Sequence, residues 1–62
     1  MALLNGTNFQ GADLTKAFFS GSDLRGANLN ESDCSAAKFQ GADLNGCSFK
    51  KATLRKVDFS NI

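Results

Sequence analysis

The chain has 62 residues, a formal charge of +1 and 42% apolar residues. This near-neutral balance argues against a nucleic-acid-binding domain or an acidic decoy. The absence of histidine removes the commonest general base and a common metal ligand, so we expect no enzyme activity, no cofactor and no metal.

The length predicts one domain over residues 1–62, close to the lower size limit for a chain that folds without disulfides or metal. No apolar run approaches the roughly eighteen residues that would suggest a membrane span. The apolar start Met1–Leu4 is too short for the core of a signal peptide. We therefore expect a cytoplasmic protein with no membrane or small-molecule partner.

A period of five residues organises the sequence, and the hexapeptide of residues 9–14 returns unchanged at residues 39–44. Every fifth residue from position 4 is apolar, and we call these residues centres. The residue two before each centre is small or short, and the residue after it is polar. We name the five positions of a unit small, pre-centre, centre, post-centre and corner. The centres are Leu4, Phe9, Leu14, Phe19, Leu24, Leu29, Cys34, Phe39, Leu44, Phe49, Leu54 and Phe59.

This period fits neither an α-helix nor a straight strand. Five residues of helix advance about 500°, which spreads the centres around the helix instead of along one stripe. In a straight strand, a step of five sends successive centres to opposite faces. A chain that bends once per unit can enclose every small residue and every centre, so the sequence predicts an all-β solenoid.

Three units, Gly11–Leu14, Gly26–Leu29 and Gly41–Leu44, resemble the pentapeptide-repeat family, whose motif is Ala-Asp/Asn-Leu-x-x. The resemblance extends over residues 2–61. It implies a right-handed quadrilateral β-helix in which four units form one square coil. We expect three coils at about residues 2–21, 22–41 and 42–61, no capping helix, and a stack about 14 Å tall at ~4.8 Å per coil.

Stacked coils would place like centres in columns. One column is Leu4, Leu24 and Leu44, and another is Phe19, Phe39 and Phe59. Cys34 is the smallest centre, so we expect a local gap beside it or an inward shift of its neighbours. Its thiol and that of Cys47 both fall at inward positions, where two reduced, buried side chains or a disulfide across the interior would fit.

The corners differ in residue type. Glycine or asparagine stands at two corners of every expected coil, and these corners predict type II turns with a positive φ. The other two corners of each coil could form either the same type II turn or a different turn. The φ angles of Glu31 and Lys56 would decide between these two possibilities. The residues at those corners are Gly11, Lys16, Glu31, Ala36, Lys51 and Lys56.

Two apolar residues break the pattern, because Leu3 and Phe18 stand at outward pre-centre positions. They are the candidate protein-contact residues, and an isolated exposed side chain is the alternative. Asp residues hold five other pre-centre positions, where they would be solvated or bonded to nearby backbone instead of forming a catalytic pair. These residues are Asp13, Asp23, Asp33, Asp43 and Asp58.

Four cations gather near the C-terminus, where they form a solvated basic edge that discourages strand pairing, or alternatively a nucleic-acid contact. They are Lys50, Lys51, Arg55 and Lys56.

The sequence predicts a non-enzymatic structural or protein–protein interaction module. A solenoid without caps exposes apolar centres and unpaired backbone at its first and last coils. Such a chain can be a fragment of a longer solenoid, stack end to end with itself, or dock onto another protein. The resemblance also offers an alternative, because some relatives are acidic dimers that mimic DNA, modulate DNA gyrase and give fluoroquinolone resistance. The short length and the charge of +1 disfavour that alternative.

Overall fold

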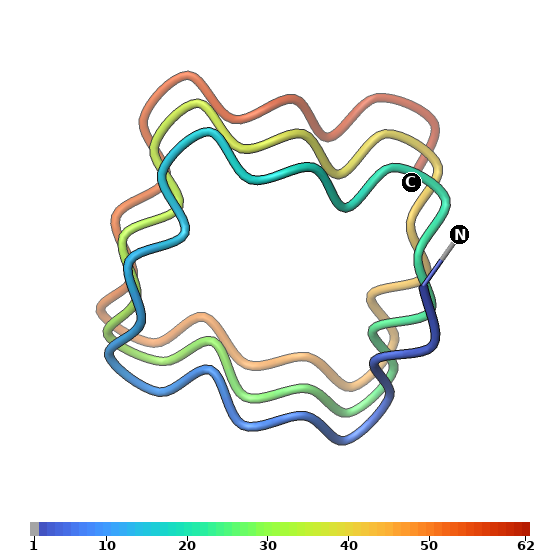
Figure 1. Ribbon diagram of the computed structural model, residues 1–62, viewed down its shortest axis with the longest axis horizontal. Helices are drawn as coiled ribbons and strands as arrows, with labels where there is room; N and C mark the ends of the chain where they lie inside the picture. The colour runs from blue at the N-terminus through green and yellow to red at the C-terminus, as the bar shows by residue number, and fades with distance from the viewer. Residues whose placement is uncertain (1) are drawn as a thin grey trace.

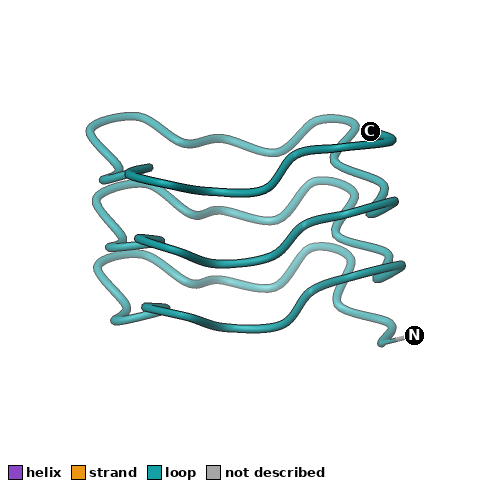
Figure 2. Cartoon of the chain, turned by 90° about the horizontal axis from the view of Figure 1, so that it is seen from above, coloured by secondary structure: helices purple, strands orange, loops and turns teal. Residues whose placement is uncertain are grey.

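The computed structural model describes residues 2–62, so Met1 of the predicted domain and of the apolar start lies outside the described residues. The described chain holds no helix and no continuous strand (Figure 2). Its pairing consists of single-residue parallel bridges between residues 20 apart, such as Asp23 with Asp43. Following these bridges, we call residues 2–21 level 1, residues 22–41 level 2 and residues 42–61 level 3.

The levels lie on top of one another and enclose a common interior (Figure 1). The Cα atoms extend over 22 × 22 × 15 Å, and the shortest dimension agrees with the expected height of about 14 Å. Each straight segment holds only one bridged residue because a turn follows after every unit. The fold is therefore built from corners as much as from strands.

Three backbone hydrogen bonds per unit join each level to the next. The centre N–H donates to a pre-centre carbonyl of the following level, as from Leu24 to Asp43 at 2.9 Å. The corner N–H donates to a post-centre carbonyl, as from Gly26 to Asn45 at 2.9 Å. The pre-centre N–H donates back to a small-position carbonyl, as from Asp43 to Ser22 at 3.0 Å. These bonds satisfy most of the buried backbone.

The corner residues all have a positive φ. At the corners from Gly6 to Lys51, the small-position N–H donates to the preceding centre carbonyl, as from Ala27 to Leu24 at 3.0 Å, and closes a four-residue turn. The corner residue has a positive φ while the post-centre residue does not, as in a type II turn. Glu31 has φ 61° and Lys56 has φ 57°, so the corners left open by the sequence also have a positive φ. Stacking on a neighbouring corner overrides the reluctance of these side chains to adopt a left-handed backbone.

The interior is filled by the centres, and their burial is greatest in level 2. All four level 2 centres are fully buried, whereas Leu54 and Phe59 in level 3 are each 38% exposed. The predicted aromatic column is confirmed, because Phe39 stacks between Phe19 and Phe59 with ring centroids 5.1 and 5.4 Å apart. Stacking at this separation is favourable between aromatic rings.

Cys34 is the small centre at which we expected a gap. It is fully buried, and its Sγ lies 3.2 Å from the Ser32 hydroxyl. That hydroxyl also donates to the Leu29 carbonyl at 2.7 Å. Ser32 therefore packs against the thiol from the small position of the same unit, and the gap stays a prediction.

Corner substitutions test the backbone geometry. At Gly26, with φ +69°, an added Cβ would meet nothing within 4 Å. We expect Gly26→Ala to lower the free energy of unfolding by about 1 kcal/mol through backbone strain alone. Ala36 has φ 60°, so the reciprocal change Ala36→Gly removes the strain of a left-handed backbone at alanine. This change should raise the free energy of unfolding by about 0.5–1 kcal/mol. Urea unfolding measures both, and equal stability of all three chains would contradict the corner geometry.

Candidate interaction surfaces

One N–H per unit, that of the post-centre residue, takes no part in the bonds between levels. In seven units the pre-centre Asp or Asn side chain accepts this N–H at 2.9–3.2 Å. This is an Asx turn, which suits a residue entering a corner. The prediction that the Asp side chains bond nearby backbone is thus confirmed. The seven acceptors are Asn8, Asp13, Asp23, Asn28, Asp33, Asp43 and Asp58.

Asn30 supplies the acceptor in one of the units where the pattern fails. The pre-centre residue of the following level is Ser48, whose side chain gives no bond to the Lys50 N–H. Instead, Asn30 Oδ1 accepts the Lys50 N–H at 2.8 Å and the Ser48 hydroxyl at 2.5 Å. Sequence reasoning missed this role, although the pairing of a serine with an asparagine 18 residues earlier carries the signal.

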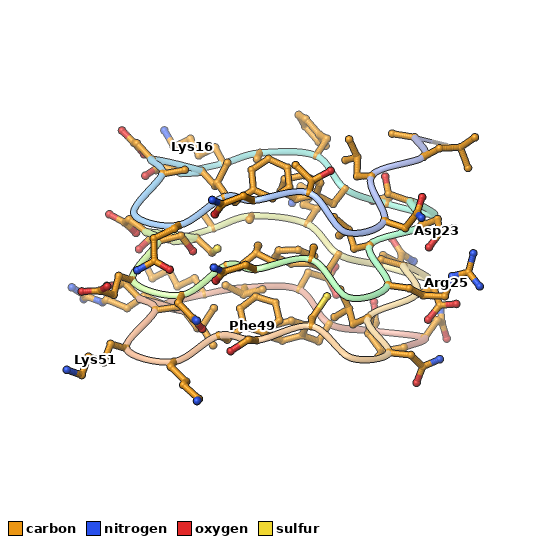
Figure 3. All side chains as sticks on the ribbon, turned by 90° about the horizontal axis from the view of Figure 1, so that it is seen from below. Lys16, Asp23, Arg25, Phe49 and Lys51 are labelled. Atoms are coloured by element: carbon orange, nitrogen blue, oxygen red, sulfur yellow. The ribbon has the colours of Figure 1, made fainter. Side chains whose placement is uncertain are left out.

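Arg25 forms an ion pair that sequence reasoning also missed. Its guanidinium contacts the Asp23 carboxylate at 2.7 Å and lies 3.9 Å from Asp43 in the next level. The three side chains project outward from one side of the stack, as Figure 3 shows for Asp23 and Arg25. The signal in the sequence is an arginine two residues after one Asp and 18 before another.

Hydrogen bonds at the corners lower the pKa of three carboxyl groups. The Arg25 side chain lowers the pKa of Asp23, and its backbone N–H adds to the effect. The Thr15 hydroxyl and N–H lower the pKa of Asp13, and those of Ser60 lower the pKa of Asp58. Donors to an ionised carboxylate favour its charged form.

The two candidate contact residues are both exposed in level 1. Leu3 is 75% exposed and bridges to Asp23, and Phe18 is 78% exposed and bridges to Lys38. Both stand at pre-centre positions without a side-chain acceptor for the post-centre N–H. The structure therefore places them on the outer surface, and their contact with a partner stays a prediction.

The basic edge lies on the outer surface of level 3, with all four cationic residues exposed. Figure 3 shows Lys51 pointing away from the interior. Arg55 and Lys56 line a shallow hollow of about 180 Å³ together with Ser35 and Ala36. Among residues 2–62 no carboxylate lies within salt-bridge distance of Arg55. A solvated basic edge stays the prediction here, with nucleic-acid contact as the untested alternative.

The two cysteines are not joined to each other. Cys34 is buried and Cys47 is half-buried, and burial raises the pKa of both thiols. The Cys47 thiol donates to the Leu24 carbonyl at 2.8 Å. Of the two arrangements that the sequence left open, the structure contains the reduced pair.

The end face of level 3 carries unsatisfied backbone groups. No described residue accepts the centre N–H groups of Leu44, Phe49, Leu54 and Phe59. The corner N–H groups and small-position carbonyls of level 3 are likewise free of partners within residues 2–62. A hollow of about 390 Å³ adjoins this face beside Ile62, over Gly41–Asn45. The face is apolar in the middle and ringed by hydrogen-bonding groups.

The end face of level 1 carries the complementary set. Its pre-centre N–H and C=O groups, such as those of Asn8 and Asp13, have no backbone partner in the described chain. Its centres Leu4, Phe9 and Leu14 are only half-buried. Each unit of level 3 thus has three free groups, which are the centre N–H, the corner N–H and the small-position carbonyl. Each unit of level 1 has the matching three, which are the pre-centre carbonyl, the post-centre carbonyl and the pre-centre N–H.

Other kinds of site have little support in the described residues. Residues 2–62 contain no group of three potential metal ligands. They also contain no helix with the length and apolar character of a membrane span.

Comparison with known proteins gives one family. The family model described as pentapeptide repeats matches residues 2–31 and 32–62, with eight copies of the repeat. No curated protein matches the chain. Proteins built from such repeats are generally structural or interaction modules without enzymatic activity.

Stability should fall in acid because of the three perturbed carboxyl groups. Their folded-state pKa values lie below the ordinary value of 3.8, so the ionised forms stabilise the fold. That stabilisation is complete above the unfolded-state pKa and is lost as the pH falls through the folded-state values. We expect Tm to be nearly constant between about pH 7 and 5 and to decline below about pH 4.

Circular dichroism melts across this pH range measure the decline. The variant Asp13→Asn/Asp23→Asn/Asp58→Asn keeps the Asx acceptors but cannot titrate, so its Tm should decline less in acid. An identical acid decline in both chains would show that these carboxyl groups are not responsible.

Proposed function

Because this chain belongs to the pentapeptide-repeat family, we propose that it is a non-enzymatic structural and protein-interaction module acting through its end faces. Its winding is a right-handed quadrilateral β-helix, in which each level forms one four-sided coil. Parallel bridges at an offset of 20 residues and a corner in every unit support this architecture. The end faces of levels 1 and 3 are the binding surfaces.

The observation that carries this proposal is the arrangement of free backbone groups on the two end faces. They recur once per five-residue unit around the whole perimeter. An isolated extended peptide could satisfy the groups on one side only, whereas a coil with the same spacing could satisfy all of them. Addition of a strand or coil to an open edge is a common mode of protein recognition.

The apolar part of each face favours the same kind of partner. The ring of Phe59 stacks on Phe39 below it, and no described ring covers its other side. Leu54 is exposed to a similar extent beside it. Covering these side chains removes apolar surface from water, which stabilises the complex by about 25 cal/mol for each Å² buried.

No observation favours the DNA-mimicking alternative. A duplex mimic needs continuous rows of negative charge, but cations interrupt the acidic positions on the outer surface. Lys38 bridges to Asp58, and Arg25 lies between Asp23 and Asp43. A gyrase supercoiling assay with this protein added tests that alternative, and we expect no inhibition.

Extension by one level tests whether the end face accepts a coil. In a chain with the segment Leu3–Gly21 appended after Ile62, Ile62 would occupy the small position that Ala2 holds in level 1. We expect Tm to rise by at least about 5 °C, the shift that roughly 1 kcal/mol produces in a domain of this size. The control appends the same residues in an order without five-residue spacing. Equal Tm values for both extended chains would contradict the proposal.

A further inference from the structure

If the end faces bind a partner, as proposed above, the level 3 end face needs an occupant. We propose that level 1 of a second copy of this chain stacks on it head to tail, without rotation about the axis. The three levels span residues 2–61, so a fourth level begins at the place of Ile62. In the proposed arrangement, each residue of the second copy's level 1 continues the column of the residue 40 positions later in the first copy.

Backbone complementarity favours a head-to-tail arrangement over stacking of like ends. A level 3 face offers centre and corner N–H groups, and a level 1 face offers pre-centre and post-centre carbonyls. A head-to-tail junction can therefore form the same three bonds per unit that join levels 1 and 2. Two level 3 faces brought together would leave their corner N–H groups without carbonyl partners.

The centre columns restrict the rotation of the second copy. Leucine and phenylalanine alternate around both end faces, with Leu4 and Phe19 on level 1 and Leu44 and Phe59 on level 3. A quarter turn places every phenylalanine over a leucine. With no rotation or a half turn, phenylalanine meets phenylalanine, as in the stacked column within the chain. Two of the four rotations remain.

An ion pair for Arg55 separates these two rotations. Arg25 lies 3.9 Å from Asp43, a residue 18 positions later in the next level. In an unrotated junction, the residue 18 positions after Arg55 is Asp13 of the second copy. After a half turn, Leu3 of the second copy would stand at this position instead. Arg55 has no acidic partner within residues 2–62, so only the unrotated junction gives it one.

The junction joins unlike faces, so each added copy presents a fresh level 3 face. A heterologous contact related mainly by translation does not close into a ring. The expected assembly is therefore an open stack whose mean length increases with protein concentration.

Charge variants test the junction in the intact chain. Asp13→Asn and Arg55→Gln should each weaken association about two- to five-fold, the range for an exposed ion pair. Asp33→Asn is the matched control, since Asp33 makes the same Asx turn in the same column but lies inside the stack. Light scattering across a concentration series measures the association. Equal effects of Asp13→Asn and Asp33→Asn would overturn the Arg55 contact.

A second charge variant tests the same junction through stronger association. In the proposed junction Lys56 lies over Lys16 of the second copy, and this like-charge repulsion partly offsets the attraction between Arg55 and Asp13. Glu31 already occupies a corner with φ 61°, so the fold accepts glutamate in this geometry. Lys56→Glu should therefore strengthen association, and the gain should shrink as salt is added. A weaker association would contradict the unrotated arrangement.

Mixed disulfides report the rotation directly. Asn8, Asn28 and Ser48 form one bridged column, so Ser48 would meet Asn8 of the second copy. An Asn8→Cys chain is mixed in a glutathione buffer with Ser48→Cys, Thr53→Cys or Asp58→Cys, all carrying Cys47→Ala. Thr53→Cys would meet Asn8→Cys after a quarter turn, and Asp58→Cys would meet it after a half turn. Bridged residues lie within the Cα separation that a disulfide spans.

Mass spectrometry under non-reducing conditions should find the mixed disulfide predominantly with Ser48→Cys. Equal yields from the three mixtures, or a higher yield from Asp58→Cys, would overturn the proposed register. A monomer at every concentration would overturn self-stacking altogether. If the chain extended by Leu3–Gly21 is nevertheless stabilised, the proposed function survives with a different coil as the partner.

Discussion

Backbone hydrogen bonding between residues about 20 positions apart is the constraint on which the structure depends. It takes three of the five N–H groups in each interior unit, and the corner turn takes a fourth. The one that remains, the post-centre N–H, selects Asp or Asn at the pre-centre position. The unpaired post-centre N–H thus explains why Asp or Asn recurs at the pre-centre position, just as the enclosed interior explains why the centre is apolar.

The same constraint connects the fold to its proposed function. A level is completed only by neighbours above and below it, so level 2 buries its centres fully while Leu54 and Phe59 stay partly exposed. The free backbone groups of the end faces repeat at the spacing of the chain itself. Under the proposed function, recognition would use the interactions that hold the chain together, and specificity would come from columns of rings and from charges such as that of Arg55.

Much of this architecture could be predicted from the sequence because one strong period sets the inward positions. The burial of Leu24 and Phe39 and the aromatic column follow from that period alone. The positive φ of Glu31 and Lys56 could not be predicted, since local propensity argues against it and only stacking imposes it. The role of Asn30 was missed because its partners lie in the next level, 18 and 20 residues later. Arg25 bonds mainly to Asp23, two residues earlier, and only its longer contact with Asp43 reaches the next level.

Scalar couplings across hydrogen bonds, measured by NMR on an isotope-labelled chain, test the pairing most directly. We expect a coupling between the Leu24 amide nitrogen and the Asp43 carbonyl carbon, and one between Asp43 nitrogen and the Ser22 carbonyl. Both would report parallel pairing of neighbouring levels. Couplings from these amides to carbonyls four residues earlier, or to carbonyls at any other long-range offset, would contradict the account.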